Sequence, residues 1–153
     1  MITANLEGRA FEILMVEDSE GDARLAREAM RDSKIHNVLH HVRDGEEAMD
    51  FLRRTGKYAA APRPDLVLLD LNLPRRDGRE VLADIKTDDA LKRIPVVILT
   101  TSSAEADVLR SYDLHANCYI TKPVNMVDFI RVVTMIQDFW LTIVTLPAST
   151  AAA

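Results

Sequence analysis

Three carboxylates, a hydroxyl group and an ammonium group follow apolar runs of the sequence, at positions where they could share one pocket. In chain order these are Glu17 and Asp18, Asp70, Thr100 and Lys122. Two carboxylates about 4 Å apart repel by roughly 4 kcal/mol at an effective dielectric constant near 20. The cluster therefore needs a cation, and an oxygen-rich site with few protein ligands suits Mg²⁺ or Mn²⁺.

Asp70 is the candidate nucleophile of this cluster. A carboxylate can attack phosphorus and form an acyl phosphate, while a metal ion and the Lys122 ammonium neutralise the transferred oxygens and Thr100 binds one of them. Taken singly, Asp18 or Asp22 is better explained as a helix cap. For the complete set, chance convergence at strand ends is the weaker explanation, so we expect a metal-assisted phosphoacceptor site.

Five short runs rich in branched side chains must position these groups. They span residues 11–16, 38–42, 66–69, 96–99 and 119–120. Apolar residues recur at helical spacing between the runs, which predicts an α/β fold with a parallel sheet and helices on both faces. In such sheets the functional crevice lies at the carboxyl ends of the strands, where the polar groups stand.

The composition is that of one ordinary globular domain. The 153 residues are 48% hydrophobic and 28% charged, and we expect a domain at 10–146 between an extension at 1–9 and a flexible tail at 147–153. A net charge of −5 without a basic cluster argues against a nucleic-acid partner. Cys118 is the only cysteine, which excludes a disulfide framework.

No signal peptide or membrane-spanning run is visible, so we expect a cytoplasmic protein that contacts no membrane.

The histidines are expected to be solvated or capping residues rather than metal ligands. They are His36, His40, His41 and His115. Adjacent residues of a strand point to opposite faces, so His40 and His41 cannot easily bind one metal ion.

The last helical segment has more apolar surface than one helix face can bury. Met126, Phe129 and the residues on their face would cover the sheet, which leaves Val127, Ile130 and Met135 outside it. The residues that follow could fold back over this surplus. We favour a two-fold homodimer with Val127, Ile130 and Met135 at its interface.

Three other functions remain open at this point. An aspartyl phosphatase or phosphotransferase of the dehalogenase-like class would use Asp-x-Asp, whereas Asn72 stands at the second position here. A flavin- or nucleotide-binding flavodoxin-like protein would need a phosphate loop after the first strand, where Glu17 and Asp18 repel phosphate. The third alternative is a pure interaction module whose acids are vestigial.

Four segments resemble the response-regulator receiver family of two-component signalling, over nearly the whole chain. They are ILMVEDSEGDARL, LVLLDLNLPRRDG, PVVILTTS and YITKPV. The resemblance implies a flavodoxin-like (βα)5 three-layer sandwich with a five-stranded parallel sheet of order 2-1-3-4-5. It also implies a signalling domain that catalyses only its own phosphotransfer and dephosphorylation, and so is not an enzyme in the usual sense.

The resemblance further implies a role for each site residue. Asp70 is the phosphorylated aspartate and binds the metal; Asp18, beside Glu17, binds Mg²⁺ directly, and Asn72 binds it through its backbone carbonyl. Thr100 provides the hydroxyl that follows the phosphoryl group, and Lys122 provides the counter-charge to that group. Tyr119 is the switch aromatic, and a cis peptide bond joins Lys122 to Pro123. Glu17 departs mildly from the family, in which aspartate is frequent, and its longer side chain suits a water-mediated role.

The long loop before Leu66 and the ending DFWLTIVTLP narrow the resemblance to small regulators paired with cyanobacterial-type and bacterial phytochromes. This implies a light-regulated sensor histidine kinase as phosphodonor, a homodimer and no output domain. Phosphorylation would then act through a changed surface or dimer interface.

Overall fold

Five parallel strands form one sheet in the order β2-β1-β3-β4-β5, which is the predicted order. Their bounds are Phe11–Val16 (β1), Asn37–Val42 (β2), Leu66–Asp70 (β3), Val96–Thr100 (β4) and Cys118–Thr121 (β5). The structure is a computed structural model that describes residues 10–31, 36–71, 73–100, 118–121, 131 and 134–135. The expected N-terminal extension and flexible tail lie outside these residues.

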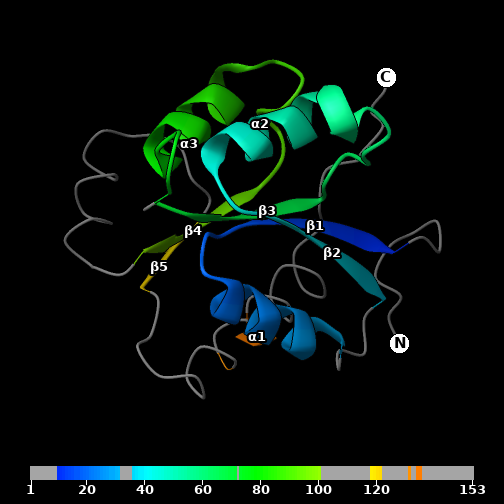
Figure 1. Cartoon of the computed structure of the whole chain (residues 1–153), viewed down its shortest axis with the longest axis vertical. Helices are drawn as coiled ribbons and strands as arrows, with labels where there is room; N and C mark the ends of the chain where they lie inside the picture. Colours follow the sequence, from blue (N-terminus) through cyan, green and yellow to red (C-terminus); the bar gives the residue numbers. More distant parts are fainter. Residues whose placement is uncertain are drawn as a thin grey trace.

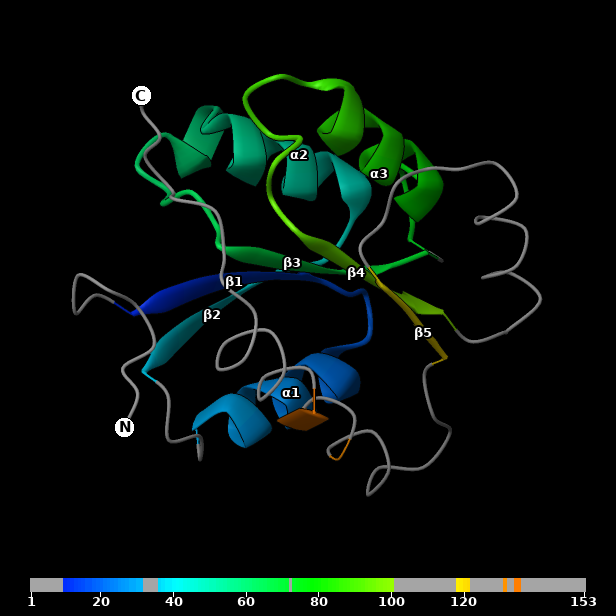
Figure 2. The same cartoon turned by 180° about the vertical axis from the view of Figure 1, so that it is seen from behind.

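Helices cover the sheet on both faces, which makes three layers. The described elements are α1 (Glu20–Arg31), α2 (Gly45–Arg53), a 3-10 turn η1 (Gly56–Tyr58) and α3 (Gly78–Thr87). Figures 1 and 2 show α1 on one face and α2 with α3 on the other. The helical residues 131, 134 and 135 lie on the α1 side in both views. No helix within the described ranges is long and apolar enough to cross a bilayer.

The central strands are buried on both faces, as their uninterrupted apolar runs predict. All five residues of β3 are buried, and in β1 only Glu12 is half-exposed. Side chains alternate between two cores, so that Ile13 and Met15 pack toward α1 whereas Leu14 and Val16 pack toward α2 and α3. This sandwich fixes the rigid edge from which the polar groups project.

Four strands, β2 to β5, are longer than the apolar runs predict, and the extensions of β3 and β4 each include a site residue. Asp70 pairs with Leu99 and so belongs to β3, and Thr100 pairs with Thr121 and so belongs to β4. Backbone hydrogen bonds of a parallel ladder do not depend on side-chain polarity, which is why the ladder continues past the last apolar residue.

The helix starts are fixed by side-chain caps. Asp44 accepts a hydrogen bond from the Glu47 amide at 2.8 Å, and Asp77 accepts one from the Arg79 amide at 2.7 Å. At the start of α1 the acceptor is the Ser19 hydroxyl, 3.2 Å from the amide of Asp22. The capping role considered for Asp18 or Asp22 thus belongs to Ser19, which leaves the Asp18 carboxylate available to the site.

Candidate metal and phosphoacceptor site

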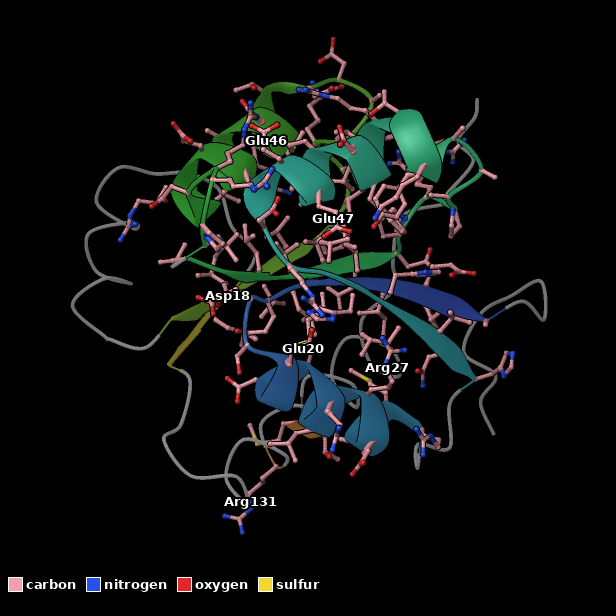
Figure 3. All side chains as sticks on the ribbon, viewed as in Figure 1. Asp18, Glu20, Arg27, Glu46, Glu47 and Arg131 are labelled. Carbon is pink, nitrogen blue, oxygen red and sulfur yellow. The ribbon has the colours of Figure 1, made fainter. Side chains whose placement is uncertain are left out.

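Three carboxylates meet where β1 and β3 end side by side. Each of Glu17, Asp18 and Asp70 offers an oxygen, and these oxygens all lie within 4.8 Å of one another. Val16 pairs with Leu69, so Glu17, which follows β1, and Asp70, the last residue of β3, lie at the same edge of the sheet. Glu17 is 1% exposed and Asp70 4%, whereas Asp18 is exposed. Figure 3 shows Asp18 at this edge, near the start of α1.

This donor set fits a small, hard divalent cation. Carboxylate oxygens are the ligands that Mg²⁺ and Mn²⁺ prefer, and two buried anionic groups at this separation repel strongly without a cation. Oxygens that bind one Mg²⁺ at about 2.1 Å stand at most about 4.2 Å apart. The 4.8 Å limit leaves room for one carboxylate to act through water, and the exposed Asp18 keeps the site open to solvent.

Glu17 is held by hydrogen bonds at three of its atoms. Its amide donates to the carbonyl of Val42 at 3.0 Å, and its carbonyl lies 2.7 Å from Nε2 of His41. Its carboxylate Oε2 accepts from the amide of Ser19 at 3.0 Å. The two residues that end β2 and the turn after β1 therefore fix both the backbone and the side chain of Glu17.

Asp70 is held by close packing of backbone against backbone. The Gly78 amide donates to the Leu71 carbonyl at 3.0 Å, which brings the first turn of α3 back onto the end of β3. A Cβ atom at Gly78 would lie 2.6 Å from the Leu71 Cα and closer still to the Asp70 carbonyl oxygen. Only glycine fits this contact.

The loop between β3 and α3 is fixed in turn by the start of α2. A Cβ atom at Gly45 would lie 2.5 Å from the Cβ of Arg76, and closer to the Arg76 carbonyl oxygen. Asp44 lies 3.6 Å from Nε of Arg75, a residue with a φ of 67°. Arg76 also forms an ion pair with Asp84 of α3. The site loop is thus clamped between two helix starts.

Several predicted site residues lie outside the described part of the chain. These are Asn72, Lys122, Pro123, Val127 and Ile130. The predicted cis peptide bond between Lys122 and Pro123 therefore also lies outside the described residues. For Thr100 and Tyr119 only the backbone is described; it pairs with Thr121 and Ile98 in the sheet. Met135 is described, and it is 58% exposed.

Sequence reasoning missed the supporting residues His41, Gly45 and Gly78. The signal for the glycines was present, because each follows a capping aspartate in an Asp-Gly pair that opens a helix. The prediction that His40 and His41 point to opposite faces fits the structure: His40 packs against Phe51 on the α2 side. Nothing in the sequence indicates the partner of His41.

Comparison with known proteins identifies the family. The family model of the response regulator receiver domain matches residues 13–134. The chain belongs to this family. Response regulator Rcp1 of Synechocystis sp. is 56% identical to this receiver over 137 residues, which are 90% of this chain and 93% of Rcp1.

Solved structures agree with this assignment. The phosphorylated cyanobacterial phytochrome response regulator RcpA matches with a TM-score of 0.86 and 54% identity, over 92% of this receiver and the whole of that chain. The Mn²⁺-bound form of Rcp1 matches with a TM-score of 0.85 and 56% identity, over 90% of this receiver and 99% of that chain. The predicted family, the likeness to phytochrome regulators and the fold class are confirmed.

Family membership also establishes the kind of activity. This receiver is a signalling protein of the two-component type, which functions through phosphorylation. Receiver domains bind Mg²⁺ or Mn²⁺. The dehalogenase-like and flavin-binding alternatives do not fit this family.

Proposed function

We propose that Asp70 accepts a phosphoryl group from a phytochrome sensor histidine kinase, with Mg²⁺ or Mn²⁺ bound by the acidic cluster. The observation that supports this best is the convergence of Glu17, Asp18 and the buried Asp70 within 4.8 Å. The likeness to Rcp1 and to RcpA, a phytochrome response regulator, supports the class of donor.

The chemistry follows from the residues of the cluster. An oxygen of Asp70 attacks phosphorus, the phosphorus–nitrogen bond of the donor phosphohistidine breaks, and the leaving imidazole takes up a proton. A bound divalent cation supplies charge neutralisation for the oxygens of the transferred group. Asp18, with the Asn72 carbonyl and Asp70, would bind that cation directly, and Glu17 would bind it through water. The protein would catalyse only this transfer and the later hydrolysis.

The remaining predicted residues complete the switch in this proposal. The Lys122 ammonium pairs with the transferred oxygens, and the cis bond before Pro123 orients it. The Thr100 hydroxyl moves toward the phosphoryl group, and Tyr119 fills the volume that it leaves. Backbone pairing of Thr100 in β4 and Tyr119 in β5 supports their nearness, since these strands are neighbours.

Labelling with acetyl phosphate tests the acceptor. The protein is incubated with acetyl phosphate and Mg²⁺, and an acid-stable, base-labile phosphoryl adduct is measured by intact mass. Asp70→Asn should form no adduct, and neither should the wild type in EDTA. Asp65→Asn is the matched control, because Asp65 is also buried but stands before β3, where it accepts a hydrogen bond from the Glu12 amide at 2.9 Å.

Two results would contradict the proposal. A wild type that acquires no adduct would favour an interaction module with vestigial acids, and an adduct that survives in Asp70→Asn would assign the acceptor elsewhere. The donor is tested separately, by comparing phosphotransfer from a phytochrome kinase and from an unrelated histidine kinase at equal concentration. Equal rates would remove the phytochrome partnership and leave the acceptor assignment intact.

We also propose that the chain forms a homodimer through its last helix. The exposed Met135 supports this, since a large apolar side chain open to solvent is suited to an interface. Light scattering should show a dimer that Val127→Glu or Ile130→Glu weakens in a folded chain. A monomer at tens of micromolar would contradict the proposed homodimer.

The limits of the domain and the cytoplasmic location of the protein stay predictions.

A further inference from the structure

We propose that His41 is a positioning residue for the acidic pair: it fixes the peptide group between Glu17 and Asp18, and so the geometry with which Asp18 meets the metal. The inference rests on the proposed function of the acidic cluster. It assigns His41 no contact with the metal or with the phosphoryl group.

The geometry at the end of β2 supports this role. Nε2 of His41 lies 2.7 Å from the carbonyl oxygen of Glu17. A carbonyl oxygen only accepts hydrogen bonds, so Nε2 bears the proton and donates it. One residue further along β2, the Val42 carbonyl accepts from the Glu17 amide at 3.0 Å. Consecutive residues of β2 thus hold the peptide groups on both sides of Glu17.

This restraint matters most for Asp18. Among the described residues, the Asp18 carboxylate has no hydrogen bond or ion pair that would orient it, and it is exposed. Its position therefore depends on the backbone from which it projects. The peptide group is planar, so a donor that fixes the Glu17 carbonyl also fixes the Asp18 amide and Cα. His41 is the side chain that restrains this plane from β2.

His40 provides a matched comparison within the same strand. Its Nε2 also lies 2.7 Å from an acceptor, but this is Oε1 of Glu12, on the opposite face of the sheet. Its ring packs against Phe51 at 5.2 Å between centroids. Loss of the imidazole nitrogens at position 40 removes a hydrogen bond of the same length without touching the peptide before Asp18.

The test compares His41→Phe, His40→Phe and His41→Gln at one fixed pH. Phenylalanine keeps a ring but has no donor, whereas glutamine restores an N–H group. Mn²⁺ binding is measured by electron paramagnetic resonance, and unfolding is measured in EDTA. Loss of an outer partner of a metal ligand typically weakens binding 10- to 100-fold, so we expect His41→Phe to weaken Mn²⁺ binding roughly tenfold. His41→Gln should recover most of this loss, and His40→Phe should bind as the wild type does.

A second readout separates positioning from stability. In the metal-free protein, the backbone amide resonance of Asp18 should shift more in His41→Phe than in His40→Phe, even where both variants unfold at the same temperature. If His41→Phe does not fold, His41→Leu is measured in its place. Wild-type Mn²⁺ affinity in the folded His41 variant, or equal losses at positions 40 and 41, would overturn the inference. A wild type that binds no Mn²⁺ would instead overturn the proposed function.

Discussion

The two buried carboxylates of the site, Glu17 and Asp70, are positioned by different physical means. Glu17 is held by hydrogen bonds that it accepts from Ser19 and His41 and by one that its amide donates to the Val42 carbonyl. Asp70 lies in the β3–β4 ladder, and the backbone of α3 also packs closely against it at Gly78. The hydrogen bond from His41 uses a side-chain donor, so a substitution can remove it at a net cost of about 1 kcal/mol. A steric contact between two backbone segments cannot be removed in this way, because no side chain makes it.

The difference corresponds to the two roles that we propose. A nucleophile must meet phosphorus within a narrow geometry, and a misplacement of about 1 Å can cost roughly 100-fold in rate. A carboxylate that binds a metal through water tolerates more displacement. We therefore expect changes around Asp70 to have large effects, and changes around Glu17 to have smaller ones that involve charge.

Gly78→Ala should have the largest effect. The new methyl group must displace the Asp70 carbonyl or the first turn of α3, because neither backbone segment can yield freely. We expect phosphorylation of Asp70 by acetyl phosphate to slow on the order of 100-fold. The free energy of unfolding should fall by about 1 to 3 kcal/mol. Intact mass against time and urea denaturation measure the two effects.

Gly21→Ala is the control for this change. Gly21 also stands in the first turn of a helix next to the site, but a Cβ atom there would lie 4.0 Å from Oγ of Ser19, an ordinary van der Waals distance. Its labelling rate should match the wild type. If both alanine variants label normally, close packing at Gly78 does not position Asp70.

Gly45→Ala should separate stability from phosphorylation. Its methyl group would meet the backbone of Arg76 rather than that of Asp70, one step away from the nucleophile. We expect a loss of about 1 to 3 kcal/mol in the free energy of unfolding, as for Gly78→Ala. For the molecules that remain folded, the rate at which acetyl phosphate labels Asp70 should fall only about several-fold. A 100-fold loss would show that α2 positions Asp70 as strictly as α3 does.

The sheet and the meeting of the acids could be predicted because they follow from short-range patterns. Apolar runs define the strands, and parallel neighbours bring the residues that follow them to one edge. The likeness of Glu17, Asp18 and Asp70 to the family motif then predicted their chemistry. Strand ends were less predictable, because the ladder that includes Asp70 and Thr100 depends on a partner strand far along the chain.

The supporting contacts could not be predicted, because they depend on where a turn directs a backbone group. His41 forms its hydrogen bond with the Glu17 carbonyl only because the chain leaves β1 along a particular path. The contact of Gly78 with Asp70 likewise requires the loop of the site to return onto β3. The Asp-Gly pairs at Gly45 and Gly78 indicate helix starts, but they do not say which segment lies against each glycine.

Glu17→Gln should change stability in the direction opposite to the glycine variants. The amide oxygen can still accept from the Ser19 amide, so the shape of the turn is kept while one negative charge is lost. In EDTA we expect the free energy of unfolding to rise by about 1 to 3 kcal/mol, because repulsion from Asp18 and Asp70 is relieved. Mn²⁺ affinity should fall roughly tenfold. Lower stability in EDTA would contradict the view that charge dominates at this end of the site.

Glu47→Gln should show the smallest effect, and one that depends on pH. Burial opposes ionisation of Glu47, but hydrogen bonds from the Tyr58 hydroxyl and the Arg43 amide, with Lys57 nearby, outweigh it and hold the pKa of Glu47 below its ordinary value of 4.5. A carboxylate with a lowered folded pKa stabilises the protein above its unfolded pKa, and this contribution is lost as the pH falls through the folded pKa. We expect Glu47→Gln to cost about 1 kcal/mol at pH 7.

The pH dependence of stability distinguishes the hydrogen bonds to Glu47 from the close backbone packing at Gly78. Urea denaturation at pH 7 and at successively lower pH should show the difference between Glu47→Gln and the wild type shrinking below pH 4.5. The difference between Gly78→Ala and the wild type should stay constant over the same range, because close packing does not titrate. Tyr58→Phe removes one donor to Glu47 and should reduce the pH dependence in part. If the cost of Glu47→Gln is the same at every pH, the hydrogen bonds to this carboxylate do not depend on its charge.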